Sequence, residues 1–200
     1  MPRILPLLIV SLALLLTGCD DSKNRVSALS GPTMGTTWSV KYTGSPDESV
    51  EALKEDIEAA LEQVNAEMST YRQDSVLSRF NQAEPGTLMD LPDDTVKVIT
   101  AAFSLSEMTG GAYDVTVGPL VNVWGFGPDP DRFSPPDALE IDAARARVGW
   151  QALLLSGNQL LQPGNVYVDL SSIAKGFAVD KIAGLLSTHG VNNYLVEVGG

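Results

Sequence analysis

The clearest pattern along the chain is an apolar residue at every third or fourth position between Val50 and Met68, with acidic residues on the other faces. This spacing predicts an amphipathic helix that packs its apolar stripe on the core. The expected buried positions are Val50, Leu53, Ile57, Leu61, Val64 and Met68. The same spacing predicts a second helix over residues 93–108, ended by Gly110 and Gly111. Its expected buried positions are Val96, Ile99, Phe103 and Met108.

Weaker periodicity predicts a third helix over residues 138–148 and a fourth over 178–190. Alternation around Trp38 predicts a strand in "TTWSVKYTG" (36–44), and "YLVEV" (194–198) predicts another. "ALLLSGNQLLQ" (152–162) and "NVYVDL" (165–170) are interpreted as a hairpin-like pair of strands. Residues 69–86 and 112–138 are rich in turn formers and are expected to be irregular. The mixed order of strands and helices predicts an α/β fold of mixed α+β layers.

The N-terminus has the pattern of an export signal rather than of a folded element. Residues 1–18 carry one early cation, Arg3, then a short apolar run and the motif "LTGC". This pattern predicts a signal peptide of the lipoprotein type, with lipidation at Cys19. Residues 19–32 are polar and are interpreted as a tether between the lipid and the domain. Asp20 and Asp21 follow the cysteine, which in lipoproteins of Gram-negative bacteria is associated with the periplasmic face of the inner membrane.

The composition excludes several classes of protein. The chain has 25 acidic and 13 basic residues and a net charge of −12, so a nucleic-acid partner is not expected. Cys19 is the only cysteine, which leaves no disulfide and no cysteine metal cage. His189 is the only histidine, which excludes a histidine-rich zinc site, and its place at a predicted helix C-terminus indicates a capping role.

The segment "VDLSSIAKGFAVDKIAGLL" (168–186) has the strongest indication of chemistry. Asp169 ends an apolar stretch, two serines follow, and Lys175 and Gly176 are expected to open the helix. A small-residue loop entering a helix exposes backbone N–H groups that bind phosphate, and carboxylate and hydroxyl oxygens suit Mg²⁺. The alternative is that Asp169 or a serine only caps the helix and Lys175 is solvated.

A second unusual segment, "GGAYDVTVGPLVNVWGFG" (110–127), combines glycines, aromatic residues and Asp114. Such a mixture suits a flat, amphipathic heterocycle, because it offers stacking surface, close backbone approach and directional polar groups. The alternative is a glycine-rich loop that uses its aromatic residues as a local core. Tyr71, in "STY" after the first long helix, offers another ring and hydroxyl.

Five segments together resemble the ApbE family of flavin transferases, the FAD:protein FMN transferases. They are "TMGTTWSV", "MSTYRQDSVLSRFN", "TGGAYDVTVGPLVNVWGFG", "VDLSSIAKGFAVD" and "VEVGG", in order across residues 33–200. The resemblance implies an ApbE-like, T-fold-like arrangement of sheets flanked by helices. It also implies Mg²⁺-dependent transfer of the FMN moiety of FAD to a Thr or Ser hydroxyl of a target flavoprotein, with release of AMP.

The resemblance further implies the residues of the site. The expected flavin-nucleotide contacts are Met34, Tyr71, Ala112, Tyr113, Asp114, Asp169 and Lys175. Ser172 is the expected Mg²⁺ ligand, and Asp180 is expected to hold Lys175 in place. The partners implied are FAD, an acceptor flavoprotein subunit of a membrane redox complex, and the inner membrane through the lipid on Cys19.

Members of the family continue past the Gly199-Gly200 pair. The expectation is therefore that residues 33–200 form the N-terminal part of a transferase domain truncated at its C-terminus, with further Mg²⁺ ligands and the catalytic groups beyond Gly200. Two alternatives remain at this point. One is an FAD pyrophosphatase that releases FMN and AMP, and the other is a non-catalytic, lipid-anchored flavin-binding protein.

Overall fold

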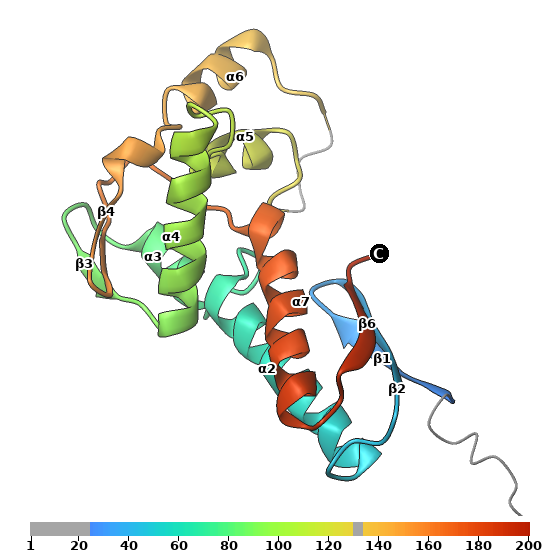
Figure 1. Cartoon of the computed structure of the whole chain (residues 1–200). Coiled ribbons are helices and arrows are strands. Elements are labelled where there is room, and N and C mark those ends of the chain that lie inside the picture. The colour runs from blue at the N-terminus through green and yellow to red at the C-terminus, as the bar shows by residue number, and fades with distance from the viewer. Residues whose placement is uncertain (1–24, 130–133) are drawn as a thin grey trace, which may run out of the picture.

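The computed structural model describes residues 25–129 and 134–200 (Figure 1). The predicted signal peptide, Cys19 and the first part of the predicted tether lie outside these residues. Within the described ranges, the helices are too short or too polar to cross a membrane.

A three-stranded antiparallel sheet forms one layer of the molecule, in the order β1-β2-β6. Strands β1 (Val26–Thr33) and β2 (Thr36–Thr43) form a tight hairpin, and β6 (Asn193–Val198) pairs with the other edge of β2. Every second residue of β2 points into the core, where Trp38, Val40 and Tyr42 are buried. This alternation is the pattern that predicts the strand.

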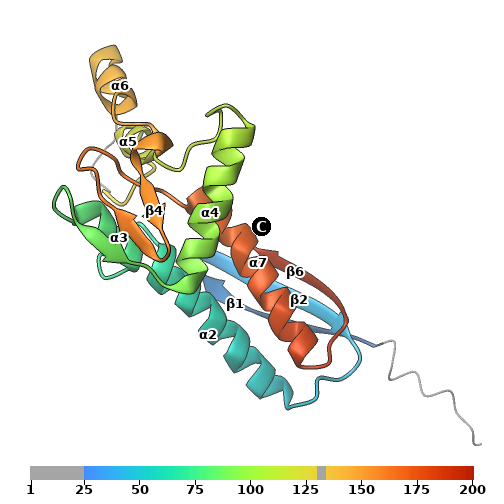
Figure 2. The same cartoon turned by 60° about the vertical axis from the view of Figure 1, so that its left-hand side comes forward.

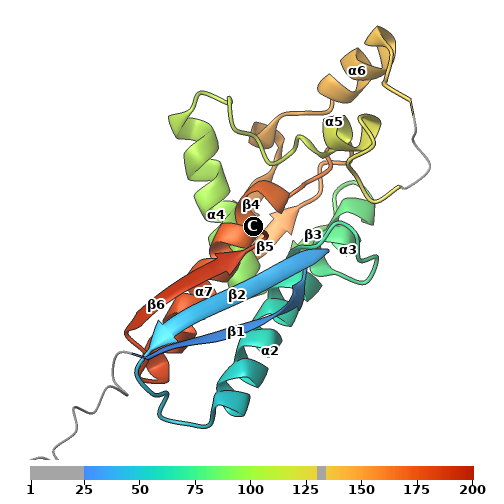
Figure 3. The ribbon, with the colours of Figure 1, turned by 90° about the vertical axis from the view of Figure 1, so that its right-hand side faces the viewer.

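Two long helices cover one face of this sheet, as Figures 1 and 3 show from two sides. They are α2 (Val50–Met68) and α7 (Ser171–Thr188), which pack against each other and run in opposite directions. The expected stripe of α2 is confirmed at Leu53, Ile57, Leu61, Val64 and Met68, which are buried. Val50 is 42% exposed, because it is the first residue of the helix and lies beyond the core.

The remaining elements form a second layer and one end of the molecule (Figure 2). Helix α4 (Asp93–Met108) packs on both α2 and α7, and its Ile99 is buried as expected. Met108 is 83% exposed, so its expected burial is wrong, because the last turn of α4 extends beyond the core. A small antiparallel sheet has the order β3-β5-β4, formed by β3 (Leu88–Asp90), β4 (Leu154–Ser156) and β5 (Gln159–Leu161). The short helices are α3 (Val76–Gln82), α5 (Gly118–Val123), α6 (Ala138–Arg145) and the 3₁₀ turn η2 (Trp150–Ala152).

Strand β1 corrects the predicted tether, which was expected to extend to residue 32. Residues 26–33 pair with β2 in register, from Val26 opposite Thr43 to Thr33 opposite Thr36. The strand is at the edge of the sheet and alternates between exposed and half-buried positions, with Leu29 as its large covered side chain. An edge strand of this kind carries little apolar alternation, so the sequence pattern resembles that of a polar linker.

The predicted strand at residues 165–170 is also wrong, although its alternation is real. Val166, Val168 and Leu170 are buried. The backbone of Val168, however, bonds to a side chain rather than to a strand, because its N–H donates to Asn81 Oδ1 and its carbonyl accepts from Asn81 Nδ2, both at 2.8 Å. The Asn81 amide thus replaces a neighbouring strand. The predicted hairpin lies within residues 154–161 instead.

Candidate functional site

A pocket of about 580 Å³ lies where the β1-β2 turn, the C-terminal part of α2 and the first turns of α7 meet. It brings together three of the residues expected in the site, Met34, Tyr71 and Lys175. Its other lining residues are Gly35, Val64, Asn65, Met68, Ser69, Thr70, Arg72, Ser171 and Ala174. Three segments that lie far apart in the sequence therefore form one cavity.

Met34 occupies the tip of the β1-β2 hairpin with a backbone φ of +48°, followed by Gly35 at +72°. Two successive positive φ values define the two-residue turn that suits paired, twisted strands, and Asn-Gly is the usual sequence there. A methionine in this conformation is strained, because its Cβ crowds the backbone. The turn places Met34 at the wall of the pocket.

Lys175 lies in the second turn of α7, because this helix begins at Ser171. The expectation that Lys175 and Gly176 open the helix is therefore wrong by one turn. Asp169 explains the earlier start, since its Oδ1 accepts a hydrogen bond from Ser171 N at 2.8 Å and ends the preceding segment. The N-terminal turn of α7 faces the pocket through Ser171, and Lys175 follows one turn later on the same side.

The Lys175 ammonium has no ion pair or hydrogen bond with any residue of the described ranges. The expectation that Asp180 holds Lys175 is accordingly wrong for this structure. The lysine side chain instead lies along Gly199, where an added Cβ would be only 2.9 Å from Lys175 Cδ. A free ammonium at the wall of a cavity, beside the N-terminus of a helix, is suited to an anion.

Tyr113 and Ser172 are brought together at the same end of α7. Their hydroxyl oxygens lie 3.1 Å apart, and the Ser172 side chain is exposed. Ala112 lies next to them in the exposed loop after α4, and its N–H donates to the carbonyl of Thr109. The two motifs that the sequence analysis singled out, residues 110–127 and 168–186, thus meet in space.

Asp114 makes its hydrogen bonds within its own chain. Oδ1 accepts from the N–H and the hydroxyl of Thr116 at 2.8 and 2.6 Å, and Oδ2 accepts from Trp150 N at 3.0 Å. These contacts fix the loop after α4 against the turn at residue 150. The role expected for Asp114 toward a flavin stays a prediction.

Asp169 is 7% exposed and lies between the two motifs. Its N–H donates to Val115 O at 2.8 Å, and its carboxylate holds the first amide of α7. Tyr71, by contrast, is 64% exposed, and its hydroxyl donates to Phe126 O at 2.7 Å. Phe126 and Trp124 are also exposed, so aromatic surface extends from the pocket toward α5.

Arg72 and Asn65 are among the polar residues of the pocket that were not expected. Arg72 forms ion pairs with Glu62 and Asp74, and these hydrogen bonds raise the pKa of Arg72 and lower the pKa of Asp74. Its guanidinium is therefore already neutralised, unlike the Lys175 ammonium. Asn65 is the other residue, and the sequence held a signal for it, since a polar side chain interrupts the apolar stripe between Leu61 and Met68.

A shallower hollow of about 570 Å³ lies on the other side of the hairpin tip. It shares Met34, Gly35 and Asn65 with the first pocket, and Glu58 and Glu62 give it acidic walls. The strained turn therefore separates a pocket with a free cation from an acidic hollow.

Fold and pocket together define an α+β protein with a cavity, lined by Lys175, between a hairpin tip and a helix N-terminus. Comparison with known proteins identifies the family. The model of the ApbE family matches residues 34–200, and the chain belongs to this family.

The relatives agree with this assignment. The chain is 47% identical over 189 residues to the FAD:protein FMN transferase of Vibrio cholerae, which covers 94% of this chain and 56% of the relative. It is 46% identical to that of Haemophilus influenzae, covering 96% and 57%. The solved structure of the flavin transferase ApbE from Vibrio cholerae matches with a TM-score of 0.84 at 46% identity, covering 88% of this chain and 58% of that one. The apo flavinyl transferase ApbE of Pseudomonas stutzeri matches with a TM-score of 0.82 at 42% identity, covering 88% and 59%.

The expected ApbE-like fold of mixed α+β layers is therefore confirmed, and so is the transferase class of the relatives. The chain spans 56% and 57% of the length of these two relatives.

Proposed function

We propose that this chain is the flavin-nucleotide-binding portion of an FAD:protein FMN transferase. Its substrate is FAD, and its product is a target flavoprotein that carries FMN on a Thr or Ser hydroxyl. The observation that carries the proposal is the Lys175 ammonium, which lines a pocket of about 580 Å³ without a carboxylate partner among the described residues. Membership of the ApbE family supports the choice of a flavin substrate.

The proposed reaction is a substitution at phosphorus. The acceptor oxygen forms a bond to the FMN phosphorus, the bond from this phosphorus to the AMP oxygen breaks, and the hydroxyl proton leaves to solvent or a base. Charge on the diphosphate opposes the approach of an oxygen nucleophile, so neutralising that charge lowers the barrier. Lys175 supplies one such charge, and Met34, Tyr71, Ala112, Tyr113 and Asp114 hold or position the flavin nucleotide.

The residues at the start of α7 fit a hard divalent cation. The donors there are oxygens, namely the exposed Ser172 hydroxyl, the Tyr113 hydroxyl 3.1 Å from it, and the Asp169 carboxylate. Mg²⁺ takes few protein ligands and fills its shell with waters and phosphate oxygens, so this small set suffices. Ser172 would hold Mg²⁺, which supplies charge neutralisation at the diphosphate when bound.

We also propose that the protein is anchored by lipid at Cys19 to the periplasmic face of the inner membrane, where its acceptor is a flavoprotein subunit of a membrane redox complex. The motif "LTGC" and the following Asp20 and Asp21 support this placement. Mass spectrometry of the mature N-terminus should find an acylated Cys19. A free N-terminus at another residue would contradict the anchor but not the transferase.

The test of the function incubates the full-length protein with FAD, Mg²⁺ and a candidate acceptor flavoprotein. Flavin fluorescence that stays on the acceptor after denaturation, with one AMP released per flavin attached, is the expected result. AMP and free FMN in equal amounts without labelled acceptor would identify an FAD pyrophosphatase instead. Binding of FAD that yields neither product and is the same with and without Mg²⁺ would identify a carrier.

A further inference from the structure

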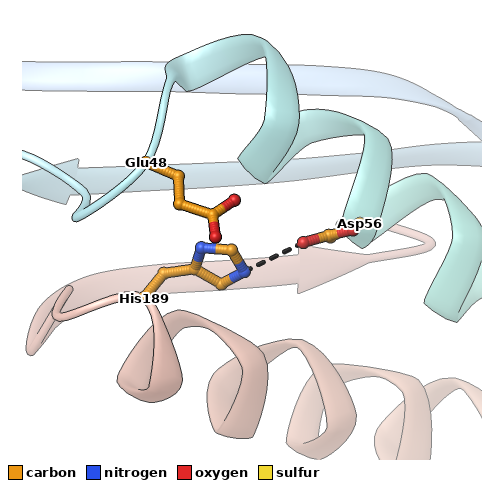
Figure 4. A group of neighbouring side chains, drawn as sticks. All are labelled: Glu48, Asp56 and His189. Carbon is orange, nitrogen blue, oxygen red and sulfur yellow. Dashed lines mark ion pairs between the residues drawn. The ribbon is translucent and has the colours of Figure 1, made fainter.

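A second group of chemistry-bearing side chains lies at the opposite end of the α2-α7 pair from the pocket. Glu48 precedes α2, Asp56 lies in its second turn, and His189 follows the last turn of α7 (Figure 4). One ligand atom from each lies within 4.8 Å of the other two. Asp56 of this group and Asn65 of the pocket are nine residues apart on α2, which corresponds to a rise of about 14 Å along the helix.

The imidazole of His189 is the buried member of this group. His189 is 8% exposed, and its Nε2 lies 3.0 Å from Asp56 Oδ2. Figure 4 shows the Glu48 carboxylate extending toward the same ring from another side. The ring is held in place by its own backbone, since His189 N donates to Leu185 O and Asp47 N donates to His189 O.

The charged side chains that the described residues place against this imidazole and the next residue are carboxylates. Besides Glu48 and Asp56, the carboxylate of Asp47 lies against Gly190, where an added Cβ would be 2.7 Å from Asp47 Oδ2. Within residues 25–129 and 134–200, neither Lys nor Arg pairs with any of these three carboxylates. Converging carboxylates without a cation repel one another, and a bound cation removes the repulsion.

The donor set indicates which cation. Oxygen ligands alone suit Mg²⁺ or Ca²⁺, whereas an imidazole nitrogen favours zinc and related transition metals. One nitrogen and two carboxylate oxygens leave a fourth position for water in a tetrahedral shell. We propose that Glu48, Asp56 and His189 bind one Zn²⁺-class ion, which ties the start of α2 to the end of α7.

This site is separate from the flavin pocket and has a structural role. The ion joins two helices that are antiparallel, so it fixes one end of the pair whose other end forms the pocket. A metal that binds the folded chain and not the unfolded chain stabilises it by mass action. A single histidine excludes a histidine-rich site but not this one. Local sequence gives no sign of it, because His189 meets Glu48 and Asp56 only in the folded chain.

The test is calorimetry of the full chain with ZnCl₂ in a Cys19→Ser background, so that no thiolate contributes. One equivalent of Zn²⁺ should bind, Mg²⁺ should bind at least about tenfold more weakly, and the midpoint of thermal unfolding should rise with Zn²⁺. Glu48→Gln and Asp56→Asn change exposed residues and should each weaken Zn²⁺ binding by more than about tenfold, since even the loss of a partner that only orients a ligand has an effect of that size. His189→Gln should abolish binding.

Glu55→Gln is the matched control, because Glu55 is an exposed acid on the same helix next to Asp56 and outside the cluster. It should leave Zn²⁺ affinity unchanged, as should Ser172→Ala in the first turn of α7, at the other end of that helix. The proposal is overturned if Zn²⁺ does not bind, if Mg²⁺ binds equally well, or if Glu55→Gln weakens binding as much as Glu48→Gln. Unchanged binding in Glu48→Gln overturns it even if His189→Gln fails to fold.

Discussion

At the scale of single residues, the candidate site is marked by the charge of Lys175 and the backbone conformation of Met34. Lys175 has no partner among the described residues, while Arg72 in the same pocket is neutralised by Glu62 and Asp74. Met34 occupies a backbone conformation that favours asparagine or glycine. The Met34 conformation has a cost in backbone strain, whereas the exposed Lys175 ammonium is solvated and open to an anion.

Lys175→Ala should weaken FAD binding by about 1.5–3 kcal/mol, the usual contribution of a hydrogen bond to a charged group. Fluorescence quenching of FAD measures the affinity. Lys97→Ala is the control, because Lys97 is an exposed lysine of α4 outside the pocket. If the Lys175 and Lys97 variants bind FAD with equal affinity, Lys175 is only a solvated surface residue.

Met34→Asn should separate binding from stability. Asparagine relieves the strain at a φ of +48° but removes the half-buried thioether from the core and the pocket. Because these two effects on the free energy of unfolding oppose each other, we expect the thermal midpoint to change by only a few degrees. The affinity for FAD should fall, as measured by titration on the folded variant. A variant that unfolds much more easily yet binds FAD normally would contradict this assignment.

At the scale of elements, the polar contacts between helices are concentrated where α2, α4 and α7 cross. Lys181 of α7 forms an ion pair with Asp94 of α4 and a hydrogen bond with Gln63 of α2. Close by, buried Glu67 of α2 accepts from Thr95 of α4 at 2.9 Å. These contacts set the distance between the helices that carry the pocket.

The Asp94 contact predicts a pH dependence of stability. The hydrogen bond from Lys181 lowers the pKa of Asp94, and burial opposes it more weakly. A lowered folded-state pKa contributes stability that is present above the unfolded value of about 3.9 and is lost as the pH falls through the folded value. Urea unfolding between pH 6 and 2.5 should show that the free energy of unfolding falls less steeply with decreasing pH for Asp94→Asn than for the wild type. Asp142→Asn, which removes an exposed pair with Arg145, should keep the wild-type slope.

Elements with strong apolar periodicity could be predicted from the sequence, and elements defined by tertiary hydrogen bonds could not. Helices α2 and α4 and strand β6 follow their own patterns. Strand β1 is an edge with one large covered side chain, Leu29, and the segment around Val168 is completed by the Asn81 amide. Neither partner can be read from local sequence.

The same division applies to the candidate site. The sequence indicated that residues 110–127 and 168–186 carry the site, but not which of their side chains meet. The structure brings Tyr113 of the first segment to Ser172 of the second. The start of α7 depends on the hydrogen bond from Ser171 N to Asp169, and the partners of Arg72 depend on how α2 ends, so those details required the fold. Asn65 alone left a local signal that sequence reasoning passed over.

At the scale of the whole molecule, a pocket lined by the cation Lys175 lies in a chain with a strongly negative net charge. The chain has a net charge of −12, with 25 acidic and 13 basic residues. The long-range field opposes the approach of a diphosphate, whereas Lys175 attracts it at short range. Salt screens exposed charges separated by more than the Debye length, about 10 Å at 0.1 M, so it weakens the distant repulsion more than a direct contact.

This balance predicts that salt has two opposite effects on the affinity for FAD, and a salt titration can separate them. In Lys175→Ala only the repulsion remains, so raising KCl from about 0.05 to 0.5 M should strengthen FAD binding, measured without Mg²⁺. In the wild type the screened attraction offsets part of this gain, so its affinity should rise less or fall. The dependence of FAD affinity on KCl concentration gives one slope for the wild type and one for Lys175→Ala. The difference between these two slopes measures the local contribution of the ammonium, because the overall charge affects both proteins in nearly the same way. Parallel slopes would mean that Lys175 does not contact the diphosphate, whatever its effect on affinity at a single salt concentration.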